Sequence, residues 1–224
     1  LSAVSSPALA APKLAAVWSD HAVVQRDAPI RVEGTAAARE RVSGTFGDRT
    51  ATAQADAQGR FTLEFPARPA SNDPVTLTVT GADGSATTVT DVLIGDVWLC
   101  SGQSNMEWPL SASVGGVAAV QASADPGLRL LLVPKDTAAA PQAAFGAPTP
   151  WVLAAPESTP PFSAACYYMA RQLRQELKIP IGAINSNWGG SQIRAWLSPE
   201  GGAKLYGAEQ MGMLAGFAKD PLKA

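Results

Sequence analysis

One short polar turn contains a serine that is placed to act as a nucleophile. Residues Ser101–Met106 follow directly after the apolar run Val97–Cys100, which is typical of a strand buried in a parallel sheet. Open α/β sheets bind their ligands at the carboxyl ends of such strands. A serine there, such as Ser104, can expose its hydroxyl beside backbone N–H groups, which suits attack on a carbonyl carbon and stabilisation of the resulting oxyanion. The alternative is an ordinary serine cap of a helix.

A second polar turn, Asn185–Ser191, also follows a short buried strand, Ile181–Ile184. It contains the paired glycines Gly189 and Gly190, which let the backbone approach a ligand closely and leave an amide N–H unhindered. Because both turns lie at the carboxyl ends of strands in one sheet, they could converge on one pocket. The alternative is a tight strand-to-helix turn with a structural role alone.

The counts of histidine and cysteine limit the mechanism. The sequence has one histidine, His21, although hydrolases with a Ser or Cys nucleophile usually need a histidine base. Its two cysteines, Cys100 and Cys166, have no metal-ligand spacing, so we expect no metal and no cofactor. The first is expected to end a strand and the second to lie on the inner face of a covering helix. We therefore predict that both stay reduced, as small buried apolar groups, even in an oxidising compartment.

The composition is that of a packed globular protein. Hydrophobic residues make up 46% of the 224 residues and charged residues 16%, which excludes a wholly disordered chain. The net charge of -2 leaves no basic surface for a phosphate backbone or an anionic membrane. The apolar runs are far shorter than the roughly 20 residues of a membrane-spanning helix. The sequence therefore predicts a soluble protein whose partners include neither nucleic acid nor membrane.

The first part of the chain has the pattern of a small β-sandwich. Residues 1–12 include Ala8–Ala10, a small-x-small motif typical of a signal cleavage site, so we expect an export-signal remnant or a disordered terminus. Residues 13–94 contain short segments rich in Val, Thr and Phe, separated by turn residues. These segments predict a β-sandwich domain with the following strands: Ile30–Glu33, Arg41–Phe46, Phe61–Phe65, Val75–Thr80 and Thr87–Thr90.

Residues 95–224 change to an α/β pattern. Leu128–Val133 is another short apolar run, and Ser163–Lys178 has apolar residues at helical spacing with Ser163 as the expected N-cap. The stretch Thr137–Pro161 holds six prolines and is expected to be a long surface loop. Strand, segment, strand, helix, strand is typical of an α/β layer. The two polar turns are therefore expected at one edge of a parallel sheet.

Three segments resemble one family of esterases. Gly95–Trp108, with its Gly-Gln-Ser-Asn-Met-Glu motif, is similar to the nucleophile block of the sialate O-acetylesterase-like branch of the SGNH hydrolases, which deacetylates sialic acids and hemicelluloses. Phe162–Trp196 resembles the glycine block of that branch and the helix before it, and Trp18–Asp27 resembles the start of its small β-domain. The resemblance implies an α/β fold in which a small N-terminal β-sandwich precedes the first part of a flavodoxin-like three-layer α/β/α SGNH hydrolase domain.

The resemblance also implies roles for single residues. Ser104 matches the nucleophile, and the amides of Ser104 and Gly190 match two oxyanion donors, with Gly189 as the neighbouring alternative. Trp108 and Trp188 are candidates for stacking on a sugar ring, although either could instead be buried in the core. The residues expected to contact the substrate flank the two turns: Gln103, Asn105, Asn187 and Trp188.

The implied activity is that of an exported carbohydrate O-acetylesterase, secreted or periplasmic, which works through a serine acyl-enzyme. Its substrate would be an acetylated hemicellulose, such as xylan or xyloglucan, or sialic acid. One rival is a non-catalytic carbohydrate-binding β-sandwich, which would need solvent-facing aromatics where the predicted strands offer only Phe46, Phe61 and Phe65. Another rival is an inactive relic that keeps only the nucleophile loop.

Some family features are missing from these 224 residues. The third oxyanion donor of the family lies in a Gln-Gly-Glu block and its acid and base in an Asp-x-x-His block, and neither block occurs here. His21 matches the opening motif of the β-domain, so we expect it to be structural. The acid and base are therefore expected from a second chain, or to have been deleted. Arg194 stands where the family often has Glu, which puts a local ion pair and the substrate preference in question.

Overall fold

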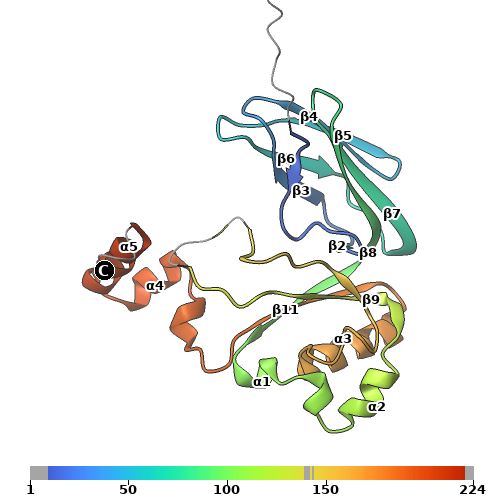
Figure 1. Cartoon of the computed structure of the whole chain (residues 1–224), viewed down its shortest axis with the longest axis vertical. Coiled ribbons are helices and arrows are strands. Elements are labelled where there is room, and N and C mark those ends of the chain that lie inside the picture. The colour runs from blue at the N-terminus through green and yellow to red at the C-terminus, as the bar shows by residue number, and fades with distance from the viewer. Residues whose placement is uncertain (1–9, 139–141, 143, 220–224) are drawn as a thin grey trace, which may run out of the picture.

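The amino-terminal half forms two packed layers of antiparallel strands (Figure 1). The structure is a computed structural model that describes residues 10–138, 142 and 144–219. Residues 1–9, on which most of the expected signal remnant falls, lie outside the described residues. The smaller layer has the order β1-β3-β6. The opposing layer consists of β4, β5, β7 and the first half of β8. The seven strands of the two layers have the following bounds: β1 Lys13–Leu14, β3 Ile30–Thr35, β4 Arg41–Phe46, β5 Arg49–Gln54, β6 Arg60–Phe65, β7 Ser71–Thr80 and β8 Ala86–Gly102.

Alternation of apolar and polar residues explains this sandwich. In β4 the buried residues are Val42, Gly44 and Phe46, and in β6 they are Phe61, Leu63 and Phe65, so each strand turns one face inward. Gly44 is needed there because a side chain at that position would overlap Leu63 of the opposite layer. All five predicted strands are present. The sequence pattern did not reveal β5, whose Thr and Ala residues have no strongly apolar face.

One long strand, β8, joins the sandwich to the α/β part of the chain. Its first half pairs antiparallel with β7, and its second half pairs parallel with β11 (Ile181–Asn187). The short β2 (Val23–Gln25) pairs parallel with β8 at the changeover. The larger sheet therefore has the continuous order β10-β9-β11-β8-β7-β4-β5. The division of the chain at residue 94 stays a prediction, and this position lies inside β8.

The second half of the larger sheet is the expected parallel layer, and the predicted α/β fold class is confirmed. β11 lies between β8 and β9 (Asp125–Leu132) and pairs parallel with both. The stretch predicted to be a long surface loop contains instead a strand, β10 (Val152–Ala154), which pairs antiparallel with β9. The expectation was wrong because the prolines flank this strand without entering it, and Trp151 beside it is buried against the sandwich core.

Short helices cover one face of the parallel layer (Figure 1). The main one is α3 (Ala164–Leu177), and Ser163 is its N-cap as predicted, because its hydroxyl oxygen accepts a hydrogen bond from the Cys166 amide at 3.2 Å. The other face packs Leu131, Val97 and Ile184 against the core of the sandwich. The remaining helical segments are α1 Ser104–Glu107, η1 Leu110–Ala112, α2 Gly116–Gln121, η2 Ile193–Trp196, α4 Pro199–Leu205 and α5 Ala208–Lys219.

The two cysteines form a disulfide, so the prediction that they stay reduced was wrong. Cys100 ends β8 and Cys166 lies in the first turn of α3, and both are almost completely buried, as expected. Their Cα atoms are 5.9 Å apart, which is within the range that a disulfide bridges. Burial could be inferred from the pattern of each segment, but the distance between two segments could not. The bond ties α3 to the strand that leads to Ser104.

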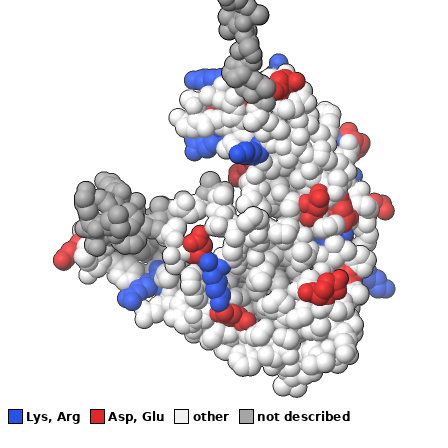
Figure 2. All heavy atoms as spheres, in the orientation of Figure 1, with Lys and Arg blue, Asp and Glu red and all other residues white. Residues whose placement is uncertain are grey.

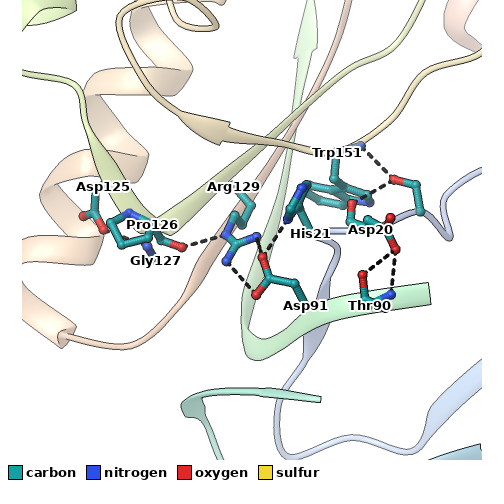
Figure 3. A network of polar contacts seen from close by, with 10 residues as sticks. Asp20, His21, Thr90, Asp91, Asp125, Pro126, Gly127, Arg129 and Trp151 are labelled. Atoms are coloured by element: carbon teal, nitrogen blue, oxygen red, sulfur yellow. Dashed lines mark hydrogen bonds and ion pairs between the residues drawn. The ribbon is translucent and has the colours of Figure 1, made fainter. Parts of the chain in front are cut away.

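A polar network lies where the sandwich meets the parallel layer (Figure 3). Arg129 of β9, which is only 3% exposed, donates two hydrogen bonds to the Asp91 carboxylate, at 2.7 and 3.2 Å. His21 Nδ1 contacts the same carboxylate at 2.6 Å. The hydrogen bond from Arg129 lowers the pKa of Asp91 below its ordinary value, and His21 lowers it further. His21 therefore belongs to a structural network at the base of the sandwich.

Candidate active site

A pocket of about 460 Å³ opens at the carboxyl ends of the parallel strands. Such an edge is where open α/β sheets bind ligands. Ser104 lines it from the turn after β8, Leu132 and Lys135 from the end of β9 and the segment that follows, and Asn187 from the end of β11. The complete lining is Ser104, Glu107, Trp108, Pro109, Leu132, Lys135, Pro161, Asn185 and Asn187.

Ser104 is exposed, and its hydroxyl contributes almost nothing to the local structure. It is the first residue of α1, while the N-cap is Gln103, whose side chain makes no capping hydrogen bond. The capping alternative for Ser104 is therefore excluded. The Ser104 hydroxyl has one long contact, 3.4 Å to the Gln103 side-chain oxygen. Gly102 precedes it with a φ of +147°, a conformation that leads the chain out of the strand and that favours glycine.

Three hydrogen bonds tie the second turn to the first. The Asn187 side-chain amide donates to the Met106 carbonyl at 2.7 Å, and the Trp188 backbone amide donates to the Gly102 carbonyl at 3.0 Å. The Gly189 amide donates to the Glu107 carboxylate. The two turns that carry the candidate residues therefore lie side by side at one end of the sheet.

Glu107 also forms an ion pair with Lys135, so two partners share its carboxylate. The hydrogen bond from Lys135 lowers the pKa of Glu107, and the one from the Gly189 amide lowers it further, which keeps the group ionised at neutral pH. Sequence reasoning did not select either residue. Lys135 could have been found as a polar residue shortly after a buried strand, the same signal that pointed to the other two turns.

The two glycines of the second turn are in different situations. The Gly189 amide is occupied by Glu107, whereas the amides of Gly190 and Ser104 make no hydrogen bond within the described part of the chain. Gly190 has a left-handed backbone, with a φ of +78°. Of the two donors left open by the sequence, Gly190 is thus the one with a free N–H.

Of the residues expected to bind substrate, some line the pocket in the structure and others do not. Asn187 lines the pocket, but its amide hydrogens are directed to the Met106 carbonyl and to the side-chain oxygen of Asn185. Gln103 and Asn105 are exposed beside Ser104 without lining the pocket, and half-buried Trp188 does not line it either.

Two residues of the pocket lining lie at opposite extremes of solvent exposure. Asn185, which we did not select from the sequence, lines the pocket at 2% exposure. Trp108 lines it too and is 57% exposed, with its indole N–H bonded to the Ala112 carbonyl at 3.2 Å. Of the two candidate tryptophans, Trp108 is therefore the one whose ring is exposed in the pocket.

Among the described residues, no histidine or carboxylate is hydrogen-bonded to the Ser104 hydroxyl. His21 lies beside Asp91, and residues 91 to 102 of β8 correspond to roughly 35 Å of strand, so His21 cannot reach the turn that carries Ser104. Arg194 lies exposed in η2 and has no ion-pair partner among the described residues. Within the described part of the chain, no three His, Cys, Asp or Glu side chains lie together as a metal site would require.

Comparisons with known proteins relate this arrangement to a family. No protein-family profile matches the chain. Sialate O-acetylesterases from Pongo abelii and Mus musculus are 35% identical over 122 residues and 36% identical over 118, covering in each case 49% of this chain and 22% of the relative. About half of the chain is homologous to the sialate O-acetylesterases. It spans about a fifth of the length of these curated relatives.

The structure has a neighbour of related activity. The crystal structure of a carbohydrate acetylesterase from Xanthomonas citri is 40% identical in sequence and superposes with a TM-score of 0.82. The match covers 89% of this chain and 45% of that one, so it extends over parts of both the sandwich and the parallel layer. The homology inferred from the motifs of the sequence is confirmed by these relatives.

Proposed function

We propose that this chain is the nucleophile-bearing part of a carbohydrate O-acetylesterase that works through a serine acyl-enzyme. The observation that carries the proposal is the pairing of an uncommitted Ser104 hydroxyl with the unbonded amides of Ser104 and Gly190 beside one pocket. The homologous sialate O-acetylesterases and the Xanthomonas citri acetylesterase support the choice of an acetyl ester on a sugar.

The chemistry assigned to these residues is acyl transfer in two steps. The Ser104 oxygen bonds to the acetyl carbonyl carbon while a base takes the hydroxyl proton, and the carbonyl electron pair moves onto oxygen, where the amides of Ser104 and Gly190 donate to it. Collapse of this intermediate breaks the bond to the sugar oxygen, which takes the proton and leaves as an alcohol. Water then attacks the acetyl-serine in the same way, releasing acetate and restoring Ser104.

The acid and base of this reaction are assigned to residues outside these 224, either in a second chain or in a further segment. The sheet has an edge that suits such an addition. From Trp98 to Gly102, β8 pairs with β11 on one side and with no other described strand on the other. Trp98 and Leu99 lie on opposite faces of this edge strand and are 42% and 67% exposed, although strands of a parallel sheet are normally covered on both faces. We expect the 224 residues alone to be inactive.

The assigned substrate is an acetylated sugar, with Trp108 as the surface on which the ring stacks. The charged residues of the pocket, Glu107 and Lys135, neutralise each other. On the face in Figure 2, Lys and Arg are interspersed with Asp and Glu, which supports a partner that is not a nucleic acid. None of the described helices is long and apolar enough to cross a lipid bilayer. A buried disulfide supports a secreted or periplasmic location, because such bonds form in oxidising compartments.

The test is steady-state hydrolysis of acetylated xylan and of p-nitrophenyl acetate by the complete enzyme. We expect mass spectrometry to detect an acetylated form of the wild type, and Ser104→Ala is expected to abolish both this form and turnover. Ser101→Ala is the matched control, since it removes an exposed serine hydroxyl from the same turn. Turnover that survives Ser104→Ala in a protein with a normal melting temperature would refute the nucleophile. Sugar binding without any turnover would favour the non-catalytic alternative.

A further inference from the structure

We propose that Glu107 is the positioning residue of the oxyanion site: its carboxylate, held by Lys135, engages the Gly189 amide and so leaves the Gly190 amide to face the substrate carbonyl. This role rests on the proposed function, since it states how that site is held in place. It gives Glu107 no contact with the reacting atoms.

The first argument is the geometry of the carboxylate. Glu107 is the last residue of α1, three positions after Ser104, so it is joined to the nucleophile by one turn of helix. One of its oxygens accepts from the Gly189 amide and the other from the Lys135 ammonium group. Both oxygens are engaged, so the carboxylate cannot rotate without losing a charged hydrogen bond. The turn after β8, the segment after β9 and the turn after β11 therefore meet at this one group.

The second argument concerns why glycine occupies positions 189 and 190. A Cβ atom on Gly189 would lie 2.7 Å from the Glu107 carboxylate, so a side chain there would have to displace that carboxylate, whereas its distance of 3.7 Å from the Ser104 Cα atom is an ordinary contact. A Cβ atom on Gly190 would meet nothing within 4 Å, and glycine is favoured there by its left-handed backbone instead. The packing at Gly189 is therefore built around the carboxylate of Glu107.

The third argument concerns charge. An unpaired carboxylate next to the oxyanion site would oppose the negative charge that develops on the substrate oxygen in the transition state. Lys135 cancels that charge while leaving the carboxylate able to hold the amide. The ion pair is partly exposed, with the two side chains 44% and 34% accessible, and such pairs add little to folding stability. We therefore expect loss of the Glu107–Lys135 ion pair to change the turn that contains Gly189 and Gly190 without unfolding the protein.

The direct test is amide hydrogen exchange, measured by NMR on the 224-residue chain. Glu107→Ala is expected to raise the exchange rate of the Gly189 amide at least tenfold. The Trp188 amide is the internal control, because its bond to the Gly102 carbonyl does not involve Glu107, and its rate is expected to change less than threefold. Glu64→Ala is the matched control variant, since it removes a surface ion pair with Arg31 in the sandwich. An unchanged Gly189 rate, or an equal rise at both amides, overturns the proposal.

The second test is kinetic and uses the complete enzyme. Glu107→Ala is expected to lower kcat by about 10- to 100-fold with KM changed less than threefold, since displacing an oxyanion donor weakens binding of the transition state rather than of the substrate. Glu107→Gln is expected to recover part of the loss, because its side-chain oxygen can still accept from Gly189. A normal kcat in Glu107→Ala overturns the positioning role alone. Activity in Ser104→Ala overturns the proposed function, so the two failures are distinguishable.

Discussion

Removal of the Cys100–Cys166 disulfide is expected to lower the free energy of unfolding by several kcal/mol. The bond closes a loop of 66 residues, which includes α1, α2, β9 and β10. For that loop length, the loss of chain entropy in the unfolded state corresponds to about 4 kcal/mol at 25 °C. This is a large share of the roughly 5–15 kcal/mol that stabilises a typical domain. The variant for the test is Cys100→Ala combined with Cys166→Ala.

The assay is urea unfolding followed by tryptophan fluorescence, with and without reductant. The wild-type protein should lose the same several kcal/mol when reductant is added, whereas the double alanine variant should not respond. Thiol titration of the unfolded, unreduced wild type should detect no free cysteine. Two reactive thiols would refute the disulfide itself, and a loss below about 1 kcal/mol would refute the loop-entropy argument.

Two further predictions concern the turn and the polar network. Gly190→Ala should lower kcat of the complete enzyme by about 10²-fold at an unchanged melting temperature, because a side chain there strains the backbone that presents the donor; a kcat within threefold of wild type would contradict this. Asp91→Asn should lower the free energy of unfolding at pH 7 by about 1–3 kcal/mol, since buried Arg129 loses a charged partner. Because the folded-state pKa of Asp91 lies below its ordinary 3.8, its contribution is present above that pH and is lost as the pH falls through the folded-state value. Urea unfolding of both proteins at pH 7 and pH 2 tests this direction. The difference in the free energy of unfolding between variant and wild type should be smaller at pH 2.

The parts of the fold that were predictable are those determined within a single segment. The period of two in β4 and β6 and the serine cap of α3 are local properties, and each was read correctly. β5 was missed because its Thr and Ala residues have little apolar contrast. β10 was missed because nearby prolines obscured a strand of three residues.

The parts of the site that were not predictable depend on distances between segments. Cys100 and Cys166 were correctly expected to be buried, but their bond requires α3 to lie directly over the end of β8. Likewise, the pairing of Glu107 with Lys135 and with the Gly189 amide joins residues far apart in the sequence. Ser104 and Gly190 could be selected from the family resemblance of the two turns, whereas the contact of the Gly189 amide with Glu107, which distinguishes the two glycines, could not be inferred.

The length of β8 has a mechanical consequence. Its 17 residues correspond to about 55 Å of strand, with sandwich contacts at one end and Ser104 just beyond the other. A paired strand offers no flexible linker about which two bodies could swing. The sandwich and the parallel layer are therefore expected to move as one rigid body, and a force on a ligand bound to the sandwich would be transmitted along β8 to the turn that carries Ser104.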